Sequence, residues 1–273
     1  MNYRHAFHAG NFADCMKHAL LVWLLRALAR KPAAFRVLDT HAGIGRYDLE
    51  ADQAQRTGEW REGIRKLQGV TEGPLADYVA LANEEAGSYP GSPAIAARLM
   101  REQDRLALVE LHEEDHATLR ALFRRDDRVA VHRRDAFEAL RALTPFPENR
   151  GLILMDPPFE QPGEYERLAA GIVEVSRRQR RLVQAAWYPI KGRAPVRAFH
   201  TALAESGVKD VLAAELHLRD PTDAARLNGC GLVVVNPPYG FEEAARAILA
   251  ELADLLATGE PGGGWTLTRI ADE

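Results

Sequence analysis

The sequence GLILMDPPF at residues 151–159 indicates the fold more clearly than any other stretch of the chain. Its first part, residues 151–155, is almost wholly apolar, which is typical of a central strand buried on both faces of a parallel sheet. The apolar run ends at Asp156, and two prolines and an aromatic residue follow. In open α/β sheets, ligands bind beyond the carboxyl ends of the parallel strands. We therefore expect a central strand at 151–155 with functional side chains directly after it.

Shorter apolar runs, separated by helix-like segments, flank this strand in the sequence. Further strands are predicted at about 37–39, 106–109, 129–131, 182–187, 211–218 and 232–235. The first five strands of the chain alternate with helices, which predicts a parallel sheet with helices on both faces. The last two follow each other without a helix, so the final strand is expected to be antiparallel. This α/β pattern, a seven-stranded and mostly parallel sheet, resembles the class I Rossmann-like methyltransferase fold.

Length and composition predict a single domain over residues 1–273. The stretch 48–100 is polar and punctuated by glycine, and we interpret it as a helical insertion subdomain. The 35 basic and 39 acidic residues give a net charge of −4, which neither indicates nor excludes a nucleic-acid partner. Cys15 and Cys230 are interpreted as free thiols. No membrane span or signal peptide is expected, so the predicted location is cytoplasmic.

Glycine and acidic residues follow the first three predicted strands. Gly43 and Gly45 follow the first strand after Asp39, Glu110 ends the second, and Asp135 follows the third. Glycine lets the backbone approach a ligand closely, and an acid that ends the second strand can accept hydrogen bonds from ribose hydroxyls. Each of these residues alone is more typical of a turn or a helix cap. Together they favour a nucleotide-like cofactor, and the incomplete glycine pattern argues against a nicotinamide enzyme.

The residues DPPF at 156–159 indicate chemistry on an aromatic amine. The lone pair of an adenine N6 nitrogen is delocalised into the ring, so this nitrogen is a poor nucleophile. The carboxylate of Asp156 and the carbonyl of Pro157 can accept its N–H bonds and direct the lone pair at a methyl group. Proline fixes φ at this point, and Phe159 can stack on a flipped-out base. The alternative is a proline-rich strand exit with a helix-capping aspartate.

A second motif of the same form, NPPY, occupies residues 236–239. It ends the last strand, which we predict to be antiparallel, so its carboxyl end points away from the cofactor edge of the sheet. We therefore assign catalysis to Asp156 and interpret Asn236 as part of a structural turn.

Polar residues crowd the segment before the first strand. They are Tyr3, Arg4, His5, His8, Lys17 and His18. An exposed polar lead-in would explain them, whereas contact with a cofactor or RNA fits their residue types. The histidines lack partners at metal-ligand spacing, so no metal is expected. The basic run 177–181, with Lys191 and Arg193 beyond it, is either a solvated helix end or a phosphate-binding patch.

Several motifs together are similar to one known family. They are YRHAFHAGN at 3–11, KH at 17–18, LDTHAG at 38–43, YPGSP at 89–93, ELH at 110–112, DPPF at 156–159, WYP at 187–189 and NPP at 236–238. On these motifs, which span nearly the whole chain, the sequence resembles the ribosomal RNA large subunit methyltransferase J family. The resemblance implies S-adenosylmethionine-dependent N6-methylation of one adenine in 23S ribosomal RNA, at position 2030, by direct in-line transfer.

The resemblance also implies roles for single residues. The S-adenosylmethionine site would consist of His18, His41, Ser92, Glu110, Asp135, Ala136 and Asp156, beside the Gly43 turn. Asp156 would also be catalytic, while Tyr3 and Lys17 would contact RNA, with Arg4 and His5 next to them. Ala136 and Phe159 replace a glycine and a tyrosine of the family pattern, but keep a backbone N–H and a stacking face. A DNA adenine-N6 methyltransferase and a non-catalytic RNA-binding module are the alternatives, and a monomer is expected.

Overall fold

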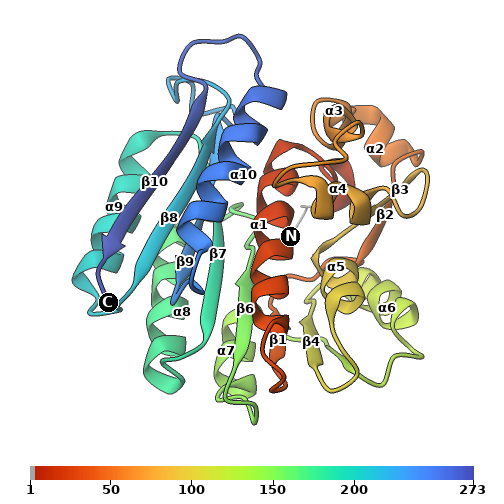
Figure 1. Cartoon of the computed structure of the whole chain (residues 1–273), viewed down its shortest axis with the longest axis vertical. Helices are drawn as coiled ribbons and strands as arrows, with labels where there is room; N and C mark the ends of the chain where they lie inside the picture. Colours follow the sequence, from red (N-terminus) through yellow and green to blue (C-terminus); the bar gives the residue numbers. More distant parts are fainter. Residues whose placement is uncertain (1–3) are drawn as a thin grey trace.

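The computed structural model describes residues 4–273. Within this range, an eight-stranded sheet has the order β10-β8-β9-β7-β6-β1-β4-β5, and β2 and β3 form a separate two-stranded sheet (Figure 1). The strands are β1 (Arg36–Asp39), β2 (Arg46–Asp48), β3 (Ser88–Pro90), β4 (Arg105–Val109), β5 (Val129–His132), β6 (Gly151–Met155), β7 (Val183–Ile190), β8 (Val211–His217), β9 (Gly229–Val235) and β10 (Gly264–Ala271).

The helices connect these strands and cover both faces of the large sheet. They are η1 (His5–Phe7), α1 (Phe12–Ala29), α2 (Asp52–Thr57), η2 (Glu59–Arg61), α3 (Ile64–Leu67), α4 (Ala76–Ala82), α5 (Ser92–Leu99), α6 (Glu113–Leu122), α7 (Ala136–Leu143), α8 (Glu164–Arg178), α9 (Arg193–Glu205) and α10 (Phe241–Leu255). In Figure 1, α1 and α10 lie in front of the sheet, and α7, α8 and α9 lie behind it. The protein therefore has three layers.

The direction of the strands confirms the predicted α/β sheet. Strands β5, β4, β1, β6 and β7 run parallel to one another, whereas β9 is antiparallel to both β7 and β8. The predicted number of strands is wrong by one, because β10 adds an edge strand antiparallel to β8. In the sequence of β10, GWTLTRIA, polar residues interrupt the apolar ones, and none of its residues is fully buried, so no apolar run marks this strand.

Strand β6 is buried along its whole length, as its apolar sequence predicts. Successive side chains of a strand point to opposite faces of the sheet. Leu152 and Leu154 accordingly pack into the core beneath α1, α5 and α10, and Ile153 and Met155 pack into the core beneath α7, α8 and α9. This double burial places the end of β6, and therefore Asp156, at the centre of the sheet edge.

Helix α1 is capped by Asn11, whose side chain accepts hydrogen bonds from the backbone N–H groups of Ala13 and Asp14 at 3.0 Å. The helix is buried on nearly every side, including its polar residues Asp14, Lys17 and His18. An exposed polar lead-in is therefore the wrong interpretation for these three residues. Their side chains therefore make contacts inside the protein.

The stretch 48–100 contains the helices α2 to α5 and the strand β3, which pairs with β2. The strand β3 lies where the sequence predicts only helices. Figure 1 shows these elements beside the carboxyl ends of β1 and β4, next to the amino end of α1. The segment thus forms one side of the sheet edge at which the predicted site residues gather.

Both cysteines, Cys15 and Cys230, are buried free thiols, as predicted. Across residues 4–273, no helix combines the length and the apolar character that crossing a membrane requires.

Gly231 in β9 makes room for the ring of Tyr188, its cross-strand partner in β7. A Cβ atom on Gly231 would lie 2.1 Å from Cζ of Tyr188, and Tyr188 is fully buried. We expect Gly231→Ala to lower the free energy of unfolding by about 1–3 kcal/mol, the usual cost of overpacking a core. Urea denaturation measures this change. The control is Gly69→Ala, an exposed position with no atom within 4 Å of the new methyl group. Equal stability of the two variants would contradict the prediction.

Candidate active site

A cavity of about 1080 Å³ opens at the carboxyl ends of β1, β4 and β6. Its walls contain every residue that the sequence assigns to a cofactor or to catalysis. These residues are His18, His41, Gly43, Ser92, Glu110, Asp135, Ala136, Asp156, Pro157 and Phe159. Of the four residues assigned to RNA, His5 and Lys17 line the cavity, Arg4 does not, and Tyr3 lies outside the described residues.

One end of the cavity is built around Glu110, at the end of β4. Its carboxylate accepts hydrogen bonds from the backbone N–H of Gly43 at 2.9 Å and of His112 at 2.8 Å. Burial raises the pKa of Glu110. Among the described residues, Nδ1 of His112 is buried without a hydrogen-bond partner. A fixed acid beside an unsatisfied ring nitrogen suits a ligand with hydroxyl groups, because each oxygen of the acid can accept a further bond.

Gly43 follows β1 with φ of 59°, in the left-handed region that favours glycine. Asp135 stands at the amino end of α7, where its Oδ1 accepts hydrogen bonds from Phe137 at 2.9 Å and Glu138 at 3.1 Å. Asp135 is therefore a helix cap, as one interpretation of the sequence proposed, and it also lines the cavity beside Ala136.

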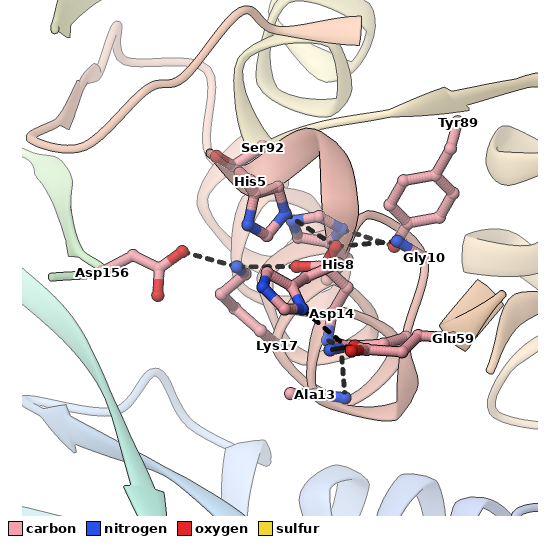
Figure 2. Close-up of polar contacts among 12 residues, drawn as sticks. His5, His8, Gly10, Ala13, Asp14, Lys17, Glu59, Tyr89, Ser92 and Asp156 are labelled. Carbon is pink, nitrogen blue, oxygen red and sulfur yellow. Dashed lines mark hydrogen bonds and ion pairs between the residues drawn. The ribbon is translucent and has the colours of Figure 1, made fainter. Parts of the chain in front are cut away.

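A buried chain of charges occupies the middle of the site (Figure 2). Nζ of Lys17 lies 2.8 Å from Oδ1 of Asp14 and 2.5 Å from Oδ2 of Asp156. The other oxygen of Asp14 is 2.9 Å from Nε2 of His5 and accepts the N–H of Gly10 at 2.9 Å. Lys17 therefore joins α1 to the end of β6, which lies 139 positions away in the sequence.

Neighbouring opposite charges determine the ionisation states of these buried side chains. Burial lowers the pKa of Lys17, but the carboxylates of Asp14 and Asp156 raise it, and the net shift is upward. Burial raises the pKa of Asp14, but the charges of His5 and Lys17 hold it well below its usual range. The buried ammonium and the carboxylate of Asp14 are therefore both charged at neutral pH.

Asp156 is held in place by its backbone as well as by Lys17. Its N–H donates to Nδ1 of His41 at 3.3 Å, and burial lowers the pKa of His41 to about 4. The imidazole is therefore neutral near pH 7, as an accepting Nδ1 requires. Within residues 4–273, no hydrogen bond reaches Oδ1 of Asp156. One oxygen is therefore fixed by Lys17, and the other is available to a ligand in the cavity.

A second buried layer supports the site from α1, β1 and α5. Nδ1 of His18 lies 2.7 Å from the hydroxyl of Tyr89, and burial lowers the pKa of His18 to about 3. Oγ of Ser92 donates to Oδ2 of Asp39 at 2.6 Å, and burial raises the pKa of Asp39 to about 6. The sequence marked Asp39 only as an acid at the end of a strand, and it gave no sign of its bond to Ser92.

Phe159 forms an aromatic wall next to Asp156. Its ring meets Tyr165 edge-on at 4.8 Å and Trp187 at 5.9 Å between centroids. Its φ of 52° lies in the left-handed region, which is uncommon for a residue with a side chain and is often found at functional sites. With this backbone conformation, Phe159 lines the same cavity as Asp156.

The second proline motif lies at the other end of the sheet. Val235 pairs with Gln184 near the start of β7, so Asn236 follows at the amino end of that strand. The amide of Asn236 donates to the carbonyls of Arg180 at 2.6 Å and Leu182 at 2.8 Å. Asn236 does not line the large cavity.

The sheet order, the antiparallel β9, the glycine turn after β1 and the DPPF segment after β6 define a protein with the class I methyltransferase fold. The profile of the family described as "Ribosomal RNA large subunit methyltransferase D, RlmJ" matches residues 32–271. The chain belongs to this ribosomal RNA large subunit methyltransferase J family, which confirms the resemblance seen in the sequence.

Relatives match along the full length of the chain. Ribosomal RNA large subunit methyltransferase J of Haemophilus influenzae is 38% identical over 281 residues, which cover 100% of both chains. The Escherichia coli protein of the same name is 38% identical over 269 residues, or 96% of each chain. The crystal structure of protein LPL1258 from Legionella pneumophila superposes with a TM-score of 0.87 at 32% identity, over 96% of this chain and 98% of that chain.

Removal of Lys17 tests the buried charges. We expect Lys17→Met to lower the free energy of unfolding by about 3–5 kcal/mol at pH 8, because breaking a buried ion pair leaves charges uncompensated. The loss should be smaller at pH 5, since without Lys17 the pKa of Asp14 rises and protonation relieves the repulsion. Urea denaturation at both pH values measures this difference.

Lys66→Met is the matched control, because Lys66 pairs with Glu62 on a partly exposed helical surface. Such pairs contribute about 0–1 kcal/mol. If Lys17→Met lost no more stability than this control, or lost the same amount at both pH values, the charges of Lys17 and Asp14 would not stabilise the fold.

Proposed function

We propose that this protein is an S-adenosylmethionine-dependent methyltransferase that methylates N6 of a single adenine in 23S ribosomal RNA. The observation that carries the proposal is the position of Asp156, with one oxygen fixed by Lys17, the other available, and Phe159 beside it in one cavity. Membership of the family supports a ribosomal RNA substrate, since both curated relatives are named as ribosomal RNA large subunit methyltransferases.

The residues around Glu110 fit S-adenosylmethionine. The two bonds that Glu110 accepts fix its carboxylate, and Nδ1 of His112 has no hydrogen-bond partner among the described residues, so both suit ribose hydroxyls. We assign Asp135 and Ala136 to the adenine of the cofactor. Gly43 has no side chain, so it lets the cofactor approach the backbone closely. We assign His18, His41 and Ser92 to the same site, since they line the same cavity. When bound, the cofactor supplies an activated methyl group.

The residues of the chain then orient the acceptor. Oδ1 of Asp156 accepts one N–H bond of the adenine amine, and the carbonyl of Pro157 accepts the other, which directs the nitrogen lone pair out of the ring plane. Lys17 holds Oδ2 and so prevents the carboxylate from turning. Phe159 stacks on the flipped base, which costs a few kcal/mol to extrude from a helix. Orientation of this kind is a large part of catalysis in a two-substrate reaction.

Oδ1 of Asp156 is also placed to receive the proton that the methylated nitrogen releases. The methylated nitrogen is strongly acidic while it is positively charged, so no strong base is required.

The amino-terminal residues are assigned to RNA. Arg4 now forms ion pairs with Glu114 at 2.7 Å and Asp115 at 2.6 Å, and these pairs must break before Arg4 can contact RNA. The assignment of Tyr3, Arg4, His5 and Lys17 to RNA stays a prediction.

The catalytic assignment is tested with the two proline motifs. Purified protein is incubated with labelled S-adenosylmethionine and protein-free 23S ribosomal RNA. We expect Asp156→Ala to lower kcat by about 100-fold to 1000-fold, in the range seen when one group that stabilises a transition state is removed. Asn236→Ala, at the other end of the sheet, should stay within about twofold of the wild type once matched for folded protein by urea denaturation. The reverse pattern would overturn the assignment.

The substrate is tested in cells. Mass spectrometry of nucleosides from 23S ribosomal RNA should show loss of N6-methyladenine at one site when the gene is deleted. The wild-type gene should restore it, and the gene with Asp156→Ala should not. Persistence of the modification without the gene would reject the ribosomal substrate. Transfer to duplex DNA but not to RNA in the purified assay would favour a DNA adenine-N6 methyltransferase, and folded protein without any transfer would favour a binding module.

A further inference from the structure

The cavity continues beyond the catalytic motif, away from Glu110. On that side its lining contains Pro189 and Lys191 at the end of β7, and residues of the loop between β8 and β9. On this side of the cavity the cationic lining residues are Lys191, Arg219 and Arg226. We call these three residues the basic wall. Glu110 and Asp135, which suit the cofactor, line the opposite end of the cavity together with Arg134 and Arg167.

The basic wall is held together by a buried asparagine. Nδ2 of Asn228 donates to the carbonyl of Lys191 at 3.1 Å and to that of Asp223 at 2.7 Å, and the N–H of Asn228 donates to Ile190 at 3.0 Å. Asn228 is fully buried. These bonds fix the loop between β8 and β9 to the end of β7, so Lys191 and the loop arginines are presented from one rigid unit.

A single carboxylate positions the two arginines. Glu260 lies 2.6 Å from Nε of Arg219 and 3.1 Å from Nη2 of Arg226. Arg219 also donates to the carbonyl of Leu227 at 3.1 Å. Lys191 is exposed and, among residues 4–273, has no ion pair. Arg219 and Arg226 thus share the carboxylate of Glu260, while the ammonium of Lys191 lies at the edge of the cavity that Asp156 also lines.

We propose that the basic wall binds phosphates of the RNA strand that flanks the methylated adenine. This inference rests on the proposed function and deepens it. A base stacked on Phe159 with its amine at Asp156 is still joined to phosphates on both sides, and these must leave the cavity near its rim. At the basic wall, Lys and Arg side chains attract phosphates, and Lys191 has no ion pair among residues 4–273 that would compete for it.

A second basic surface lies too far away to take the same phosphates. Arg177, Arg180 and Lys209 line a smaller cavity of about 350 Å³ together with Asn236, at the amino end of β7. The strand β7 separates this surface from Lys191, which follows its carboxyl end. The basic run 177–181 is therefore split from Lys191 in space, and it supplies matched controls of equal charge.

The test compares Lys191→Ala and Arg226→Ala with the control Arg181→Ala. All three remove one exposed positive charge, and all three positions are checked for folding by urea denaturation. We expect each wall variant to raise the Kd and KM for protein-free 23S ribosomal RNA by about threefold to tenfold, with kcat within about twofold. The slope of log Kd against log salt concentration should fall by about 0.7 to 1 for each lost phosphate contact. Arg181→Ala should match the wild type.

Calorimetric titration with S-adenosylmethionine provides the remaining readout, and affinity for the cofactor should be unchanged in all three variants. Wild-type Kd, KM and salt slope in both wall variants would overturn the inference. An equal effect of Arg181→Ala would also overturn the inference. It would mean that RNA affinity depends on net charge alone, or that RNA contacts the opposite surface. RNA binding is measured apart from turnover. Absence of methyl transfer by the wild type would therefore reject the proposed function, while the Kd values and salt slopes would still test phosphate binding by the basic wall.

Discussion

The ammonium of Lys17, buried between Asp14 and Asp156, is the interaction on which the rest of the site depends. Burying charges is costly unless each one is paired and hydrogen-bonded, so these groups are stable only while α1 and β6 keep their positions. The Asn11 cap fixes the start of α1, and the apolar residues of β6 fix the strand in both cores. The orientation of the Asp156 carboxylate is therefore set by the packing of the whole sheet against α1.

The groups around this charged chain are kept neutral or weakly acidic by burial. His18 and His41, with pKa values lowered to about 3 and about 4, act as uncharged hydrogen-bonding groups and do not compete with Lys17 for the carboxylates. Burial raises the pKa of Asp39 from 3.8 to about 6. The folded state therefore holds this proton more tightly than the unfolded chain, and its contribution to stability is lost as pH rises through that interval. Lys17 thus pairs with both Asp14 and Asp156 without competition from these neutral histidines.

The sequence predicts a strand well where a run of apolar residues marks it, as a strand buried on both faces requires. β6 is the clearest case, and the edge strand β10, with no fully buried residue, escapes detection. The position of Asp156 was predictable from topology, since the carboxyl ends of parallel strands meet at one edge. The burial of Lys17 was not, because a polar residue near a helix start resembles a surface residue until its distant partner is known. The basic wall needs the fold as well, since its members come from two separate segments.

The two proline motifs show that strand direction, and not local sequence alone, gives such a motif its environment. Both contain a residue with φ near 50°, Phe159 at 52° and Asn236 at 51°. After the parallel strand β6, the carboxylate of the first motif meets Lys17 and the large cavity. After the antiparallel β9, the amide of Asn236 binds backbone carbonyls, and Tyr239 is 99% exposed. An aromatic ring that is open to solvent has no wall to hold a base against it. The reversal of one strand therefore places the first motif against Lys17 and the large cavity, and the second motif in a turn that backbone carbonyls fix.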